Sequence, residues 1–311
     1  MRRALKGAIF PAALGTVLVA CTMGAGEAEI EGAKPNPIHS EAFKSYWYRG
    51  TAELTRYELE QARYGETHRG DAVLIFVTED FLPKEQVKYE GRDRDTEVVS
   101  VLKLNATRKF PTGIYPYSIM TSVFTPVDPD QGRTLKATTS IQEWCGHTYT
   151  QLNFRKNRYE GVLHSYFQDE ADDRIDIDGA MLEDEIWTRI RLDPSSLPTG
   201  EVEIVPGLHY ARLLHRKSKV ESAHAERSAS SDTDGVSVYR VEYRELPRNL
   251  EIRFETAFPH AIVSWQEEER SAGGGSAGSI TRAVKTHALV VDYWNKNSAA
   301  DSHYRRQLGL D

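Results

Sequence analysis

One short stretch of this chain combines residue types that can act as a nucleophilic or metal site. In the run TSIQEWCGHTYTQLNFR, residues 139–155, Glu143, Cys145 and His147 lie two positions apart. In a strand such side chains share a face about 6.6 Å apart at the backbone, so contact is possible but not favoured. A Cys-His nucleophile normally takes its histidine from a distant segment and adds a third orienting group. A zinc site needs three well-placed ligands, and the sequence has no CxxC or HxxxH spacing.

A structural role is therefore the favoured interpretation of this stretch, with catalysis and metal binding as the alternatives. Gly146 is typical of a bulge or bend where a long strand turns a corner. On this interpretation Trp144 packs inward, on the same side as Leu152. Four side chains then share the opposite face: Glu143, Cys145, His147 and Tyr149.

A second pattern resembles a calcium loop of the form D-x-[DN]-x-[DN]-G-x5-E. Residues 174–185 match it at Asp176, Asp178, Gly179 and Glu185. The first position is Arg174, a cation where a ligand carboxylate belongs, and the preceding segment is strand-like. The favoured interpretation is an acidic helix start rather than a calcium site.

Other chemical signatures are weak. The histidines are scattered without zinc spacing, and neither a Gly-rich phosphate loop nor a G-x-S-x-G elbow occurs. His164, Asp169 and Glu170 lie close together in HSYFQDEADD, but an acidic run after a strand is usually a solvated loop. The sequence therefore predicts no cofactor and no metal, and leaves enzymatic activity open.

The first residues predict export. Arg2, Arg3 and Lys6 precede an uncharged run from residue 7 to 20, which is too short to span a bilayer. The run ends in LVAC, which resembles the lipobox of bacterial lipoproteins, with Cys21 as the acylated new N-terminus. Residues 1–20 are then the signal peptide. An ordinary secretory signal cut near residue 20 is the alternative.

The predicted location is the cell envelope. Two or three acyl chains on Cys21 make a lasting anchor, whereas a single chain binds only marginally. Position 22 is threonine rather than aspartate, which by resemblance to the sorting rule of enteric bacteria favours the outer membrane. Residues 21–42 are small, polar and proline-punctuated, as in a flexible tether.

Charge and length limit the possible partners. Beyond residue 20 the chain has 36 Lys and Arg against 46 Asp and Glu, a net charge of −10. Such a surface repels phosphate backbones, so nucleic acid is not an expected partner. About 270 residues beyond the tether suffice for one large domain, expected over residues 43–311. With Cys21 acylated, Cys145 has no partner for a disulfide.

Period-two alternation dominates this predicted domain. In LEIRFETAF, residues 250–258, apolar and charged side chains fall on opposite faces, as a half-buried strand requires. Short turns such as DPDQG and RKNR separate the alternating segments. We therefore expect a mainly β fold, an antiparallel meander that curls into a half-barrel or barrel. The alternating segments are 71–79, 97–104, 115–125, 133–144, 147–155, 159–167, 236–245, 250–258, 261–269 and 281–293.

One or two short helices are expected beside the strands. Residues 179–190 form the first, with Asp178 as its cap and an ion pair from Glu185 to Arg189. The motif SAAD at 298–301 predicts a capping box for a terminal helix. Flexible loops are expected at 218–235 and 271–279.

Five longer stretches resemble a family of uncharacterised bacterial lipoproteins that automated labels sometimes call septum formation inhibitor Maf. The stretches cover residues 46–81, 112–126, 138–153, 183–200 and 292–310. The Ser-x-Ser-Pro-Arg-Arg motif of the Maf nucleotide pyrophosphatases does not occur in this chain. The resemblance therefore implies a lipoprotein and no catalytic residue.

Three classes of function remain open. A curled sheet on a tether commonly holds an apolar ligand such as a lipid, because its inner faces leave a cavity. The alternatives are a structural or assembly accessory that binds another envelope protein, and an envelope hydrolase. The residues expected to face a ligand are Tyr117, Glu143, His147, Tyr149 and His164.

Overall fold

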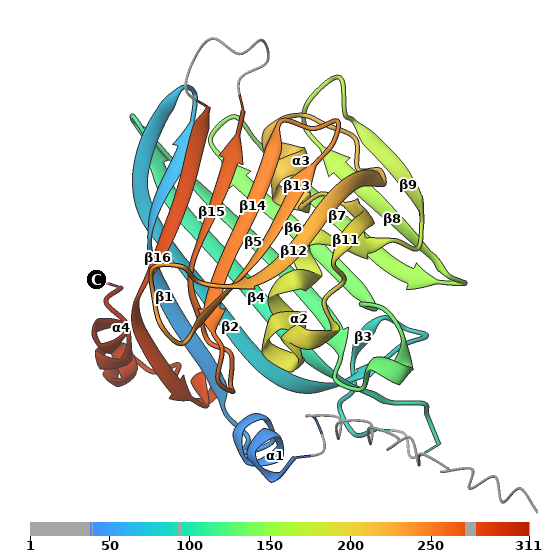
Figure 1. Ribbon diagram of the computed structural model, residues 1–311, viewed down its shortest axis with the longest axis vertical. Coiled ribbons are helices and arrows are strands. Elements are labelled where there is room, and N and C mark those ends of the chain that lie inside the picture. The colour runs from blue at the N-terminus through green and yellow to red at the C-terminus, as the bar shows by residue number, and fades with distance from the viewer. Residues whose placement is uncertain (1–37, 39, 93–94, 271–277, 311) are drawn as a thin grey trace, which may run out of the picture. The chain divides into compact units, whose positions relative to one another are not determined.

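One sheet of sixteen strands forms the framework of the computed structural model of this chain (Figure 1). The structure describes residues 38, 40–92, 95–270 and 278–310, and these belong to one compact unit, Asn36–Asp311. The strand order is β10-β11-β12-β13-β14-β15-β16-β1-β2-β4-β5-β6-β7-β8-β9, with β3 paired to β2. Because β9 and β10 are free edges, the sheet is curled but not closed. The predicted mainly β, antiparallel curled sheet is confirmed.

The strands pair antiparallel except for β10 with β11, which are parallel. Their bounds are β1 (Ala52–Arg63), β2 (Glu66–Leu82), β3 (Val87–Lys88), β4 (Val99–Thr112), β5 (Tyr115–Pro126), β6 (Lys136–Glu143), β7 (Gly146–Arg155) and β8 (Arg158–Ser165). The second half contains β9 (Asp172–Asp178), β10 (Met181–Leu182), β11 (Gly200–Val205), β12 (Glu221–Ala229), β13 (Val236–Tyr243), β14 (Arg248–Glu255), β15 (Ile262–Glu269) and β16 (Ser279–Val291).

The helices of the described residues are short. The α-helices are α1 (Glu41–Trp47), α2 (Ile186–Leu192), α3 (Leu208–Leu213) and α4 (His303–Gln307). The 3-10 turns are η2 (Pro129–Gln131), η3 (Glu183–Glu185), η4 (Pro194–Ser196), η5 (Tyr293–Asn295) and η6 (Ala299–Ser302). Helices α2 and α3 lie inside the curl of the sheet (Figure 1). They fill it together with inward-facing side chains of the strands, because each supplies apolar residues to the core.

Alternation identified most strands, and each of the ten predicted segments overlaps an observed one. The loop expected at 218–235 is wrong in its first half, because residues 221–229 form β12. The inward positions of β12 include Ala223 and Ala225, whose small side chains gave little apolar contrast. The other expected loop falls mostly on residues 271–277, which lie outside the described residues.

The first predicted helix begins later than expected. Asp178 does not cap it, since this residue ends β9, and α2 starts only at Ile186. The expected ion pair forms, with Arg189 Nε donating to Glu185 Oε1 at 2.7 Å. At the C-terminus the capping box is confirmed, because Asp301 Oδ2 accepts hydrogen bonds from the amide and the hydroxyl of Ser298.

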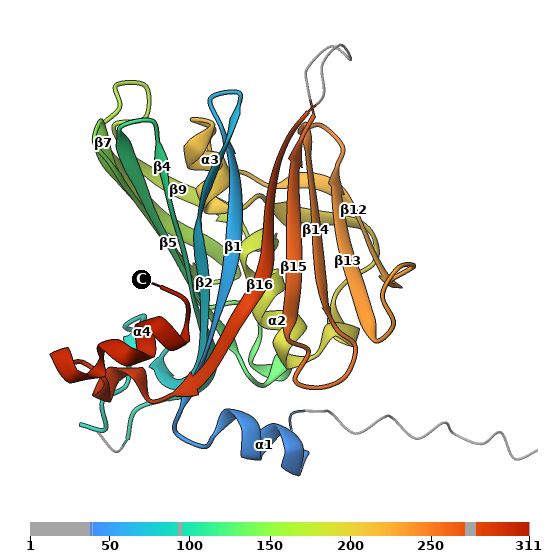
Figure 2. The ribbon, with the colours of Figure 1, turned by 90° about the vertical axis from the view of Figure 1, so that its left-hand side faces the viewer.

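The two ends of the sheet differ in what they carry. The upper end, as drawn in Figure 2, carries α3 and the turns that join β1 to β2 and β4 to β5. By strand direction, the turns from β6 to β7 and from β8 to β9 lie at this same end. Helix α1 lies at the lower end (Figure 2). The end of the sheet that carries α3 is called the upper end from here on.

Candidate binding site at the upper end of the sheet

Helix α3 separates two pockets at the upper end. The first has a volume of about 140 Å³ and lies between α3 and the strands β1, β15 and β16, with Arg248 of β14 also lining it. The second has a volume of about 440 Å³ and lies between α3 and the strands β7, β8 and β9. We call them the first and second pockets.

A buried ion-pair network lies beside the first pocket. Arg248 binds Glu183 through two hydrogen bonds, of 2.9 Å from Nε and 2.6 Å from Nη2. It also reaches Glu267 Oε2 at 3.3 Å, and Tyr243 donates to Glu183 at 2.7 Å. Burial acts to raise the pKa of Glu183, but the Arg248 charge outweighs it and lowers that pKa below its usual value. Both carboxylates therefore stay charged in the interior.

The same network joins opposite walls of the curled sheet. Arg108 of β4 donates to Glu267 of β15, although β16, β1 and β2 lie between these strands in the sheet. His209 of α3 lies 3.1 Å from the other oxygen of Glu267. Burial, and then the Arg108 charge, lower the pKa of His209, which favours a neutral imidazole. The network thus fixes α3 against both walls.

Asp184 is the unusual member of this cluster. Burial raises its pKa to about 7, because the folded chain supplies less compensation for its charge than for the neighbouring Glu183. Its Oδ2 accepts a hydrogen bond of 2.9 Å from the backbone amide of Leu208, the first residue of α3. Asp184 therefore holds the start of α3 in place and titrates near neutral pH.

Three residues that line the first pocket carry a buried polar atom without a hydrogen-bond partner. The atoms are Gln61 Oε1, Arg63 Nε and Tyr210 Oη, all unpartnered within the described part of the chain. Gln61 is only 4% exposed, and its amide nitrogen already donates to Thr281 at 2.9 Å. If the amide were turned, its nitrogen would take the unpartnered place, so one end of the amide needs a partner in either orientation.

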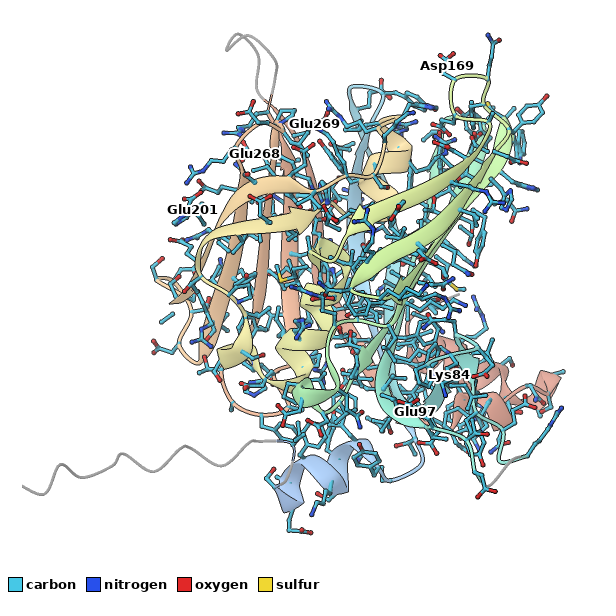
Figure 3. The ribbon with its side chains drawn as sticks, turned by 90° about the vertical axis from the view of Figure 1, so that its right-hand side faces the viewer. Lys84, Glu97, Asp169, Glu201, Glu268 and Glu269 are labelled. Atoms are coloured by element: carbon cyan, nitrogen blue, oxygen red, sulfur yellow. The ribbon has the colours of Figure 1, made fainter. Side chains whose placement is uncertain are left out.

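The pocket also carries acidic side chains. Glu268 and Glu269, at the end of β15, line it together with Glu267. Figure 3 shows Glu268 and Glu269 in the upper part of the molecule, well above Lys84 and Glu97. Glu267 is neutralised by its two arginines, whereas Glu268 has only a hydrogen bond from Asn249 among its described contacts. Arg63 and Arg248 line the pocket as well, so its walls carry both signs of charge, with one more acidic than basic side chain.

The second pocket contains a smaller polar group. His215 Nδ1 lies 2.6 Å from Glu170 Oε1, and Arg212 Nη1 lies 3.8 Å from the same oxygen. The Nε of Arg212 is buried without a described partner. The acidic run after β8 is thus not only solvated, because Glu170 turns toward α3.

The stretch around Cys145 is a hairpin rather than a bent strand. β6 ends at Glu143 and β7 begins at Gly146, so Trp144 and Cys145 form the turn. The predicted inward packing of Trp144 is wrong, because its side chain is 68% exposed and stacks on the ring of Tyr115. A two-residue turn reverses the chain and changes which face each later side chain occupies.

The predicted shared face is therefore wrong as well. Glu143 is buried on the inner face, and so is Tyr117 of β5. His147, Tyr149 and His164 are exposed on the outer face, where they line a groove of about 490 Å³. The structure brings these three expected ligand-facing residues together and separates them from the other two.

This geometry does not favour catalysis or metal binding at the stretch. A hydrogen bond with Glu143 raises the pKa of the exposed Cys145 thiol, whereas a nucleophilic cysteine needs a lowered one. Glu143 and His147 lie on opposite faces. Within the described residues, no group of three His, Cys, Asp or Glu side chains is placed to hold a metal ion.

Substitutions in the hairpin give a first prediction. Gly146→Val should lower the free energy of unfolding by about 1–3 kcal/mol, since a Cβ there would lie 2.9–3.0 Å from the Tyr166 side chain. Cys145→Ser, at an exposed turn position, should change it by less than about 0.5 kcal/mol. Urea denaturation of both variants measures this ranking. A larger loss for Cys145→Ser would contradict the placement of Cys145 in the turn.

The calcium-like pattern also separates in space. Asp176 and Asp178 both pair with Arg158 of β8 on an exposed surface. Glu185 is buried and pairs with Arg189 instead. The pattern is therefore an edge strand followed by a turn into α2.

Sequence reasoning missed the buried network. One available signal was a charged residue at an inward position of an alternating strand, as with Arg108 between Ala106 and Phe110. The same signal marks Glu267, two positions after the buried Trp265.

Cys21, the signal peptide at 1–20 and most of the expected tether lie outside the described residues. Among the helices that the structure does describe, none has the length and apolar character needed to cross a membrane. Comparison of the chain with family models, curated proteins and solved structures finds no match.

Proposed function

We propose that this protein is a cell-envelope lipoprotein, anchored to the outer membrane through Cys21, that binds a small polar ligand in the first pocket. The supporting observation is the set of three buried, unpartnered atoms at that pocket, Gln61 Oε1, Arg63 Nε and Tyr210 Oη. A buried polar atom without a partner costs about 1–3 kcal/mol. A ligand that bonds to these atoms offsets this cost and gains affinity from it.

The lining suggests the chemistry of this ligand. A pocket of about 140 Å³ has room for a small molecule rather than an acyl chain. Gln61 Oε1 requires a hydrogen-bond donor, and Glu268 and Glu269 favour positive charge nearby. The ligand class that fits is a small amine that also carries an acceptor for Arg63 Nε, in which the ammonium faces the two glutamates.

An apolar ligand such as a lipid is the second candidate, at the groove on the outer face. Met120 and Tyr149 line this groove and are 43% and 37% exposed, so both present apolar surface to a ligand there. His147 and His164 supply polar contacts at its margin. The inner side of the curled sheet offers less room, because the core and the two helices occupy it.

Native mass spectrometry of the mature protein, purified gently from the cells that make it, tests the proposal. We expect a diacylated or triacylated N-terminal Cys21 and an additional small-molecule mass that is lost on collisional activation. Gln61→Leu should lose that mass. The matched control Gln131→Leu, at an exposed position of η2, should keep it.

The proposal is contradicted by one combination of ligand-binding results. If the wild-type protein carries no small ligand and small amines bind wild type and Gln61→Leu equally, the first pocket is not the site. A co-purified lipid that is lost in Tyr149→Ser would favour the groove instead. Circular dichroism must show that each variant is folded.

A further inference from the structure

The four most exposed large hydrophobic side chains of the described residues all lie at the upper end. They are Tyr64, Ile114, Trp144 and Tyr166, which are 60%, 83%, 68% and 79% exposed. Each lies at or beside the turn of a different hairpin, in the order β1–β2, β4–β5, β6–β7 and β8–β9. We call these four residues the tip row.

Neighbouring members of the tip row are connected. The hydroxyl of Tyr64 lies 3.2 Å from that of Tyr115, and the Tyr115 ring stacks on Trp144 with 6.2 Å between centroids. The amide of Tyr166 donates to the carbonyl of His147, which places the fourth turn against the third. Tyr64, Trp144 and Tyr166 are thus linked through Tyr115 and through the pairing of β7 with β8, and Ile114 adjoins Tyr115 in the chain.

The opposite wall of the same end is different. The turn between β13 and β14 carries Arg244 and Glu245, and β15 ends in Glu268 and Glu269. By contrast, the second and third turns of the tip row, residues 112–115 and 144–146, contain no charged residue. The uncharged character thus belongs to these two turns, since the first turn is flanked by Arg63 and Glu66 and the fourth carries Asp169 and Glu170.

We infer that the tip row inserts into the interfacial layer of a lipid bilayer. Tryptophan and tyrosine combine an apolar ring with a polar group and are enriched at the membrane–water interface. A bilayer accepts single side chains from separate turns, since it needs no complementary shape. A stable protein partner would have to cover about 800 Å² on this chain, and the tips present a narrow row instead of such a face.

The chain outside the structure allows this contact with the anchoring membrane. Residues 22–37, between Cys21 and the first described residue, span at most about 55 Å. β2 has 17 residues, so the sheet is also about 55 Å tall along it. Helix α1 lies at the lower end (Figure 2), so the tip row reaches the anchoring bilayer when residues 22–37 are fully extended or when the domain lies along the membrane. Contact with the anchoring membrane rests on the proposed anchor at Cys21, whereas insertion of the tip row into a bilayer does not.

A tethered domain needs only weak insertion energy. The proposed anchor at Cys21 already holds the domain at its membrane, so the tip row need not supply a lasting attachment. Four interfacial side chains acting together then suffice for a reversible contact. The row is thus a docking surface for a bilayer and not a second permanent anchor.

Fluorescence quenching by brominated lipids tests the inference. The mature protein is mixed with vesicles of phosphatidylethanolamine and phosphatidylglycerol, with or without bromine on the acyl chains. We expect quenching of wild type that is lost in Trp144→Phe. It should persist in Trp294→Phe, because Trp294 is exposed but lies after β16, outside the tip row.

A second variant keeps the fluorophore and removes its neighbours. Tyr64→Ser, Ile114→Ser and Tyr166→Ser combined should weaken the partitioning of Trp144 into the bilayer by about tenfold or more. The Gln61→Leu variant should be quenched like wild type, which separates this test from that of the pocket. If Trp144 is unquenched by brominated lipid but accessible to aqueous acrylamide, the inference is wrong and a protein partner becomes the better occupant.

Discussion

Replacing Arg248 with alanine is expected to lower the free energy of unfolding by about 3–5 kcal/mol. Arg248 is 2% exposed and neutralises Glu183 while also contacting Glu267. Without it, the carboxylate of Glu183 keeps only the Tyr243 hydroxyl among the partners described here. An uncompensated charge in the interior must then be protonated or reached by water, and either response costs stability.

Arg240→Ala is the matched control for this prediction. Arg240 also lies on a strand and pairs with two glutamates, Glu226 and Glu251, but these groups are substantially exposed. Exposed pairs contribute about 0–1 kcal/mol, so its loss should be small. Chemical denaturation at neutral pH gives both values. Equal losses for the two variants would contradict the account of the buried network.

The second large effect is expected from Asp184→Asn, which should raise the free energy of unfolding above neutral pH. Asparagine is uncharged and keeps an oxygen that can accept the hydrogen bond from the Leu208 amide. Since burial raises the pKa of Asp184 from 3.8 to about 7, ionisation of the wild-type residue costs on the order of 4 kcal/mol in the folded state. We expect a gain of about 2–4 kcal/mol at pH 8.

The same shift predicts how stability depends on pH. Between the ordinary pKa of 3.8 and about 7, the folded protein retains a proton on Asp184 that the unfolded chain has lost. This contribution to stability therefore falls as pH rises through that window. Glu183 and Glu267 have lowered pKa values, so their contribution is lost as pH falls below their ordinary range. The two effects together place the stability maximum at mildly acidic pH.

Unfolding free energies of wild type and Asp184→Asn at a series of pH values test this sign. The unfolding free energy of the variant should not decline between pH 4 and 7. At the acidic end of this window it should equal that of wild type. A variant that is less stable than wild type at pH 8 would show that the Asp184 charge is compensated in the folded protein.

The strand content was predictable because β-sheets with one buried face impose period two on the sequence. Period two is weak where inward side chains are small, as in β12, where Ala223 and Ala225 give little contrast. The turn of Trp144 and Cys145 was also not predictable, because neither residue is a common turn former. The glycine that suggested a bend follows the turn and begins the next strand.

The candidate site was less predictable than the fold. Arg248 and Glu267 lie on the paired strands β14 and β15, but Arg108 and Glu183 are distant from them in the sequence and only the fold brings them together. The charges of Arg108, Arg248 and Glu267 looked like ordinary surface residues of alternating strands. His147, Tyr149 and His164 were expected to face one ligand and do share a groove, because β7 and β8 pair in register at Tyr149 and His164. Tyr117 and Glu143 belong to the other face, since the hairpin at residue 144 reverses the assignment.

A crystal structure of the mature protein, purified without added ligand, tests the central claim most directly. We predict density for a small molecule in the first pocket, within hydrogen-bond distance of Gln61 Oε1 and Tyr210 Oη, with a basic group facing Glu268 or Glu269. A pocket that contains only solvent, with the Gln61 amide and the Tyr210 hydroxyl both bonded to protein atoms, would contradict the claim.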